Sequence, residues 1–290
     1  MRLAKNIVGL RDCELNVIDN YDDDFAALYR CVWDSSLGDR QEGLLKELFS
    51  DTPIPNTVLD AAAGTGELAV RLAKNGQEVT ANELSPSMQH YIQKQKAANA
   101  FTDNALQIVE PGICWRNLPD KIGKKSFGLV ICVGAALAHC DNSRTGILND
   151  SLAALASLVE SNGFLLVDCK RYAEDGRELQ GDGSKRPLEI ADSEAVEWID
   201  LAGNHRKGTL RSSFSISADS TLTRVFHYQE FGSANGHKRE WTFRTWPVAK
   251  LEVCRIVASC GLRLVQEKVL GGTGKKLPVD NLLFRRESSQ

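Results

Sequence analysis

Apolar residues follow two different spacings in the first part of the chain. Short continuous apolar runs are typical of strands buried on both faces, and apolar residues that recur every three or four positions are typical of amphipathic helices. The runs predict strands at residues 57–60, 78–82, 106–109, 127–133 and 164–168. The helical spacing predicts helices at residues 24–50, 67–75, 85–98 and 144–161. This alternation predicts an α/β fold, a Rossmann-like parallel sheet with helices on both faces and a ligand crevice at the carboxyl ends of its strands.

The pattern changes in the last part of the chain. A glycine- and charge-rich loop precedes three stretches that favour strands, at residues 209–217, 222–230 and 239–245, so we expect a small antiparallel β cover over the crevice. A further helix and two strands are predicted at residues 247–259, 262–269 and 281–285. We therefore expect an N-terminal helical segment that contributes to the cofactor site, a Rossmann-like core, a β-rich substrate cover and a C-terminal part that completes the core sheet, at residues 1–50, 51–175, 176–246 and 247–290.

The composition narrows the class of protein. With 42% hydrophobic residues, 25% charged residues and a net charge of −3, the chain is typical of a globular protein and not of one that binds nucleic acid or an anionic membrane. No apolar stretch approaches the roughly 20 residues of a membrane-spanning helix, and no signal-peptide pattern opens the chain, so we expect a cytoplasmic protein. The eight cysteines lack zinc-binding spacing, so we expect reduced thiols and no metal.

A turn of small residues follows the first predicted strand. The run Val-Leu-Asp-Ala-Ala-Ala-Gly-Thr-Gly includes Ala62, Gly64 and Gly66, which would let a ligand lie against the backbone. A dinucleotide enzyme usually presents G-x-G-x-x-G here and holds a pyrophosphate at the next helix. Asp60 and Glu67 would repel that anion, but they suit the sulfonium and amino groups of S-adenosylmethionine (SAM). We therefore expect SAM as cofactor, with S-adenosylhomocysteine as its product.

A carboxylate also follows the second predicted strand. Glu83 lies about twenty residues beyond the glycine turn, at the position where an acidic residue accepts hydrogen bonds from ribose hydroxyls. Each signal alone is weak, because small-residue turns and solvated acids are common. Together, within five strand–helix steps, they predict a nucleoside site.

Four blocks of the sequence resemble the glycine N-methyltransferase and glycine/sarcosine N-methyltransferase group of class I SAM-dependent methyltransferases. They are residues 32–40, 58–67, 79–88 and 127–139, and the last block continues to residue 172. The resemblance implies a class I methyltransferase sheet. It also implies that the SAM site is lined by Trp33, Arg40, Ala62, Glu83, Leu84, Met88, Val133 and His139. In this interpretation Arg40 binds the methionine carboxylate, and Met88 lies along the adenine.

The chain departs from the family pattern at three places. Gly112 and Ile113 stand where the family has an acidic or amide residue followed by Trp, so any adenine contact there must come from the backbone. Ala135 replaces the Asn of a Gly-Asn-Ser sequence. Lys170, followed by Arg171, stands where an Arg grips the carboxylate of glycine, and Lys offers a point charge in place of a bidentate fork. We therefore expect an acceptor other than glycine, for which Ala135, Lys170 and Arg171 are candidate contacts.

The candidate bases and acceptor contacts come from three segments. His139 and His227 are candidate general bases, and Tyr172, His227 and Tyr228 are candidate walls of the acceptor pocket. Cross-strand packing explains the residues of the presumed cover equally well.

Three functions remain open from the sequence. The first is N-methylation of a small amine, the second is O-methylation of a small metabolite, and the third is SAM binding without methyl transfer. The partner is expected to be a small-molecule acceptor, and the sequence leaves open its identity and whether the chain forms a homo-oligomer.

Overall fold

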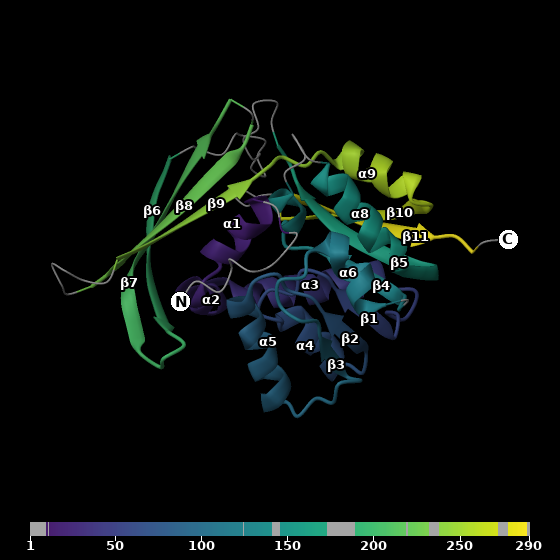
Figure 1. The fold of residues 1–290 in the computed structure, drawn as a ribbon, viewed down its shortest axis with the longest axis horizontal. Helices are drawn as coiled ribbons and strands as arrows, with labels where there is room; N and C mark the ends of the chain where they lie inside the picture. The colour runs from purple at the N-terminus through teal and green to yellow at the C-terminus, as the bar shows by residue number, and fades with distance from the viewer. Residues whose placement is uncertain are drawn as a thin grey trace.

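A computed structural model of the 290-residue chain provides the fold (Figure 1). It describes residues 10, 12–123, 125–140, 146–172, 189–218, 220–231, 238–271 and 278–288. Some sequence-based predictions lie outside these residues, namely the glycine-rich loop at residues 176–183 and the start of the helix expected at 144.

A seven-stranded sheet forms the centre of the fold, in the order β10-β11-β5-β4-β1-β2-β3. Its strands are β1 (Thr57–Asp60), β2 (Glu78–Ala81), β3 (Leu106–Ile108), β4 (Phe127–Cys132), β5 (Val159–Lys170), β10 (Leu262–Leu270) and β11 (Val279–Arg286). Strands β1 to β5 pair in parallel, and β11 pairs antiparallel with both β5 and β10. The strand order reverses between β1 and β4, because β2 and β3 lie on one side of β1 and β4 and β5 lie on the other. Ligands bind at such a switch point in α/β sheets.

Helices cover both faces of this sheet, because each face presents apolar residues. One face packs against α3 (Ser35–Leu48), α4 (Glu67–Lys74) and α5 (Pro86–Ala98). The other packs against α6 (Leu118–Ile122), α8 (Ile147–Ser157) and α9 (Lys250–Ser259). The predicted class I α/β sheet with helices on both faces is therefore confirmed.

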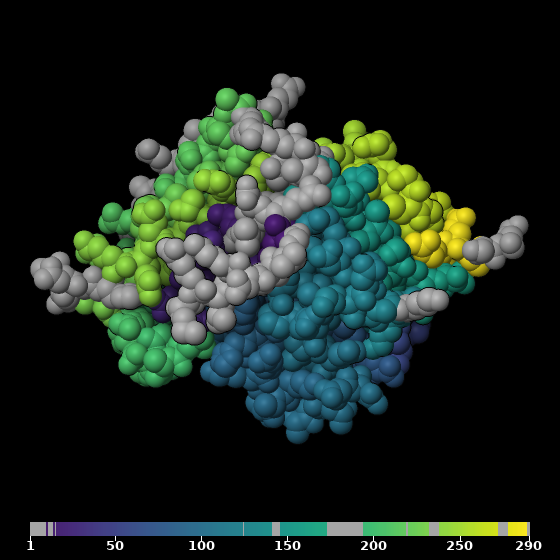
Figure 2. Space-filling model, in the orientation of Figure 1, coloured from purple at the N-terminus to yellow at the C-terminus, as the bar shows by residue number. Residues whose placement is uncertain are grey.

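A separate four-stranded antiparallel sheet, which we call the cover sheet, stands beside the core (Figure 1). It consists of β6 (Glu189–Ile199), β7 (His205–Ile216), β8 (Leu222–Glu230) and β9 (Lys238–Thr245). Its inner face buries Trp198, Tyr228 and Trp241 together with residues of α2 (Asp23–Tyr29). In the space-filling view the cover sheet and the core lie on opposite sides of the purple N-terminal residues (Figure 2). The small antiparallel cover is confirmed, with β6 as an additional strand.

The N-terminal segment connects the two sheets. Helix α1 (Asp12–Asn20) is fastened to the cover by side chains that hydrogen-bond to the backbone of β9. Asn20 Oδ1 accepts from the Thr242 amide at 2.7 Å, and Asn16 Oδ1 accepts from the Arg244 amide at 3.0 Å. The single helix predicted at 24–50 is divided into α2, a π-helical turn and α3.

One predicted boundary is wrong. The helix expected to reach residue 161 ends at Ser157, and β5 begins at Val159. The strand starts early because a register shift against β4 accommodates Asn162, which adopts a left-handed conformation with φ 64°. Asn and Gly residues, which favour helix ends, also favour such irregular strand positions.

Candidate functional site

The glycine turn and Glu83 are joined by hydrogen bonds at the carboxyl ends of β1 and β2. The amide of Gly64 donates to Glu83 Oε2 at 2.8 Å, and the amide of Ser85 donates to Oε1 at 2.8 Å. Gly66 adopts φ 88°, and a Cβ there would come within 2.9 Å of Ile92 on α5. The turn therefore needs glycine for both its conformation and its packing, and it fixes the direction of the Glu83 carboxylate.

Burial changes the acidity of this pair of carboxyls. It raises the pKa of Asp60 to about 7 and that of Glu83 to about 7, although backbone hydrogen bonds partly oppose the shift in both. The nearby Glu83 raises the pKa of Asp60 further. A ligand that brings hydroxyl donors or positive charge would favour the ionised carboxylates.

A cavity opens beside this turn. Nine of the predicted site residues line it: Asp60, Ala62, Gly64, Glu83, Leu84, Met88, Ile113, Val133 and His139. They come from β1, β2, α5 and the segments after β3 and β4. The structure thus brings together most of the predicted cofactor set at the carboxyl edge of the sheet.

The loop after β3 contributes residues that the sequence analysis missed. Ile113 is followed in the cavity wall by Cys114 and Trp115, whose indole Nε1 donates to the Ala61 carbonyl at 2.6 Å. The Asn82 amide donates to the carbonyls of Ala61 and Ile113, each at 3.3 Å. Ile113 stands at the Trp position of the family pattern, and the Trp115 indole lies two residues later in the same wall. Gly112 shapes the turn with φ 81° but does not line the cavity.

The loop after β4 is held by Asp168, a buried residue of β5. The amides of Gly134 and Ala135 donate to its carboxylate at 2.8 and 2.9 Å. Burial raises the pKa of Asp168 to about 6. Both loop residues are left-handed, with φ 88° and 61°. Ala135 therefore matters through its backbone, since its neighbours Gly134 and Ala136 line the cavity and it does not.

His139 lies in the short helix η4 (Ala136–His139) and lines the cavity beside Tyr21. Burial, and then the positive charge of Lys170, lower its pKa to about 4, so the imidazole is neutral near pH 7. It contacts the Arg244 backbone, and its buried Nδ1 has no hydrogen-bond partner in the described part of the chain.

The N-terminal block enters the cavity through residues other than those predicted. Trp33 packs against Phe25, Tyr29 and Phe226, with ring centroids 5.5–6.0 Å apart, and does not line the cavity. Arg40 is exposed and is also absent from the cavity lining, although its charge lowers the pKa of Asp168, so both predicted contacts stay predictions. Tyr21, Tyr29, Asp34, Gly38 and Gln41 line the cavity in their place. The π-helical turn inserts one extra residue into the helix and changes which side chains face the cavity. Helical spacing in the sequence does not reveal this extra residue.

The cover sheet does not bring His227 or Tyr228 to the cavity. His227 points outward from β8, where its Nδ1 lies 3.2 Å from Glu240 and nearly half of its side chain is exposed. Tyr228 points inward, but its ring is buried against Trp198 with centroids 4.3 Å apart. Neither residue lines the cavity, cross-strand packing accounts for both positions, and their roles as base and acceptor wall stay predictions.

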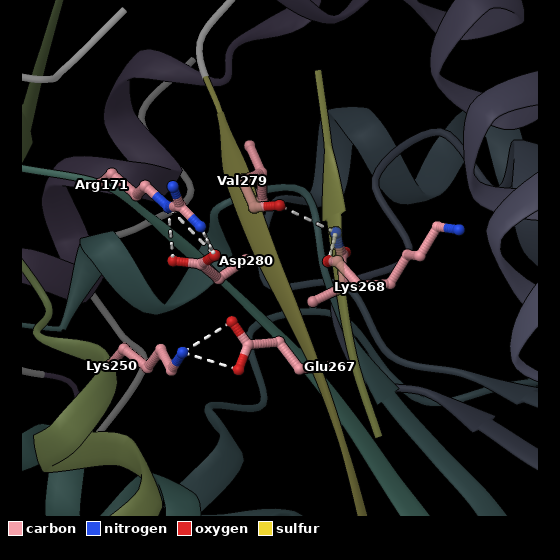
Figure 3. Close-up of polar contacts among 7 residues, drawn as sticks. Arg171, Lys250, Glu267, Lys268, Val279 and Asp280 are labelled. Atoms are coloured by element: carbon pink, nitrogen blue, oxygen red, sulfur yellow. Dashed lines mark hydrogen bonds and ion pairs between the residues drawn. The ribbon is translucent and has the colours of Figure 1, made fainter. Parts of the chain in front are cut away.

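The residues after β5 are also arranged differently from the prediction. Arg171 faces Asp280 of β11 in a fork, with contacts of 2.6–3.1 Å (Figure 3). Lys170 lies on the same face of β5 as Asp168, and Tyr172 is half-buried. None of these three predicted acceptor contacts lines the cavity. Figure 3 also shows Lys250 paired with Glu267, so this edge of the sheet is a structural ion-pair cluster.

Two general features complete the description of the site. Among the residues that the structure describes, no group of three or more His, Cys, Asp or Glu side chains is placed to hold a metal ion. No described helix combines the length and apolar character needed to cross a membrane.

Comparison with known proteins agrees with this architecture. A family model described as a methyltransferase domain matches residues 58–163. The glycine/sarcosine/dimethylglycine N-methyltransferase of Actinopolyspora halophila is 31% identical over 116 residues, which is 40% of this chain and 19% of that protein. Human glycine N-methyltransferase is 28% identical over 120 residues, which is 40% of this chain and 41% of that protein. The matches thus span less than half of these relatives.

Solved structures match over almost the whole chain. The CcbJ methyltransferase from Streptomyces caelestis has a TM-score of 0.64 at 19% identity, covering 93% of this chain and 98% of its own. SAM-bound CalS10, an amino pentose methyltransferase from Micromonospora echinaspora, has a TM-score of 0.61 at 15% identity, covering 90% and 97%. Residues 58–163 thus match a methyltransferase domain, the chain has the fold of solved SAM-dependent methyltransferases, and its similarity to the glycine/sarcosine N-methyltransferases is distant.

Proposed function

We propose that the protein transfers the methyl group of SAM to the nitrogen of a small-molecule amine other than glycine. The observation that carries the proposal is a single cavity that joins the Glu83-anchored glycine turn to a wall made by Tyr21, Tyr29 and His139. The part beside the glycine turn suits a positively charged nucleoside. The wall made by Tyr21, Tyr29 and His139 suits an uncharged nucleophile.

The residues present fit SAM. The Glu83 carboxylate is fixed by two backbone amides and can accept hydrogen bonds from ribose hydroxyls. Met88, Ile113 and Trp115 offer apolar surface for an adenine ring. When bound, SAM supplies a methyl group activated by the sulfonium, so the protein needs mainly to align the acceptor and exclude water.

His139 is the proposed acceptor-side residue. Its low pKa keeps it neutral, and its unpartnered Nδ1 can accept a hydrogen bond from an amine or orient the lone pair. Tyr21 and Tyr29 add hydroxyl groups and ring faces to the same wall. The aromatic rings can bind an amine, and the neutral His139 can accept a hydrogen bond from its N–H group.

The absence of a cationic fork argues against glycine. No Lys or Arg is among the described residues that line the cavity, and Arg171 is committed to Asp280. A free carboxylate on the acceptor would lack the bidentate partner that Arg supplies. We therefore propose an amine without a carboxylate beside the nitrogen.

Structural neighbours support N-methylation over the O-methyltransferase alternative. They include the amino pentose methyltransferase, the sugar N-methyltransferase KedS8 from a Streptoalloteichus species and the glycopeptide N-methyltransferase MtfA. A magnesium protoporphyrin IX methyltransferase from Synechocystis has a related fold, so the fold alone does not fix the acceptor, and O-methylation is the second candidate. We also propose that residues 1–50 contribute to the cofactor site through Asp34 and Gly38, and that the cover sheet supports the acceptor side by packing against α2.

The test combines binding with turnover. Calorimetric titration with SAM and S-adenosylhomocysteine, with NAD as the negative control, should show binding of the first two only. Turnover should then be screened against amines, amino acids and hydroxylated metabolites, with His139→Gln as the matched variant. Methylation of an amine supports the proposal, turnover only on hydroxyl compounds selects O-methylation, and tight binding without turnover selects a binding protein.

A further inference from the structure

The π-helical turn η2 (Arg30–Asp34) lies between α2 and α3. Single π turns inside helices occur frequently at functional sites, because the extra residue redirects side chains. Here Trp33 joins the aromatic cluster under the cover sheet, whereas the next residue, Asp34, lines the cavity. The turn therefore presents a carboxylate to the ligand site.

Asp34 is buried at the glycine-turn end of this cavity. Only 7% of its surface is exposed, and burial raises its pKa to about 6, with Glu67 adding to the effect. Gly38 allows this placement, since a Cβ there would come within 2.4 Å of the Glu67 side chain. Helix α3 can thus approach α4 closely, and Asp34 reaches Thr65 and Glu67.

The cations near Asp34 are engaged elsewhere. Arg71 is paired with Asp39, Glu42 and Glu67 at 2.7–2.9 Å. The Arg30 guanidinium lies over the Tyr91 ring, 5.1 Å from its centroid. Both guanidinium groups lower the pKa of Asp34 only through space, and none of the ion pairs found among the described residues includes Asp34. A buried carboxylate without a cation is costly, so its counter-charge is expected from the ligand.

We propose that Asp34 binds the α-ammonium group at the methionine end of the methyl donor. This inference rests on the proposed SAM site and adds a contact to it. The donor carries its ammonium at the end away from the adenine, and Asp34 lies against Thr65 and Glu67, where the glycine turn enters α4. An acceptor amine would instead lie at the wall formed by Tyr21 and His139.

The test compares two thioethers that differ only in this group. The first is S-adenosylhomocysteine, and the second is its analogue in which hydrogen replaces the α-amino group. Calorimetry on the wild type should give about 10- to 100-fold weaker binding of the second, as for loss of a charged hydrogen bond. Asp34→Asn should weaken the first by a similar factor and leave the second within about twofold, because the lost partner is the same.

Asp39→Asn is the matched control, because Asp39 lies on the same helix and its side chain is 67% exposed beside Arg71. It should change neither affinity. Equal binding of both thioethers by the wild type, or an equal loss of both in Asp34→Asn, would overturn the assignment. The wild-type comparison decides the question even if the variant does not fold. If the wild type binds neither thioether, the donor site itself fails, and the Asp34 contact fails with it.

Discussion

The two ends of the cavity are built in different ways. The donor end consists of loops that directly follow β1 and β2, and backbone amides fix its key carboxylate. The acceptor end is assembled from α1, α2, the loop after β4 and the neighbourhood of the cover sheet, and it depends on side-chain packing. A local motif can thus define the proposed donor site, whereas the proposed acceptor site depends on contacts between distant parts of the chain.

The largest effect is expected from breaking the packing that supports the acceptor end. Trp241 is 2% exposed, contacts Phe25 and donates its indole N–H to Asp22 at 2.9 Å. Trp241→Ala should lower the free energy of unfolding by about 3–5 kcal/mol. Urea unfolding measures this change, with the exposed Phe231→Ala as control, which should stay within about 0.5 kcal/mol. A loss below about 1 kcal/mol would show that the aromatic cluster does not support the fold.

A substitution at the donor end should abolish ligand binding while the protein stays folded. Glu83→Gln places an NH2 group against the Gly64 or Ser85 amide, so one hydrogen bond becomes a repulsive contact. We expect at least about 100-fold weaker binding of S-adenosylhomocysteine by calorimetry. Glu110→Gln, at a largely exposed position after β3, is the control. Unchanged affinity in Glu83→Gln would remove the ribose assignment.

The pH dependence should differ between the free and bound protein. In the free protein, Asp60 and Glu83 have pKa values of about 7, so the folded state holds protons that the unfolded chain has released. Their contribution to the free energy of unfolding is complete below about pH 4 and is lost as the pH rises through about 7.

The bound donor favours the ionised forms, so its affinity should rise by up to about tenfold per group between about pH 6 and pH 8. Calorimetry with S-adenosylhomocysteine across this range measures the slope, and Asp60→Asn should flatten it. A flat profile in the wild type would show that neither carboxyl changes protonation on binding.

The same contrast explains what the sequence could predict. The turn, Glu83 and Met88 lie in one continuous stretch whose spacing follows from a strand, a turn and a helix. Trp33 and Arg40 do not line the cavity, and the π turn beside them leaves no trace in the helical spacing. His227 and Tyr228 do not line it either, and the sequence does not show which face of β8 is inward. Strand β6 was missed, since acidic residues alternate with its apolar ones and are uncommon in strands.

The smallest expected effect concerns backbone conformation at Ala135. Its φ of 61° is unfavourable for Ala, whereas Asn tolerates it, so Ala135→Asn should raise the free energy of unfolding by about 0.5–1 kcal/mol. Ala100 provides a matched comparison, since it is exposed after α5 with φ 52°. Thermal and urea unfolding should give similar gains at both positions if conformation alone matters.

A gain at Ala100 without one at Ala135 would mean that the two Asp168 hydrogen bonds already hold the loop after β4 in a geometry that a larger side chain disturbs. Tertiary contacts would then determine the backbone conformation at the acceptor end, even at position 135, where the local conformation favours Asn. Equal gains would instead show that this part of the acceptor end follows the same local rules as the donor end.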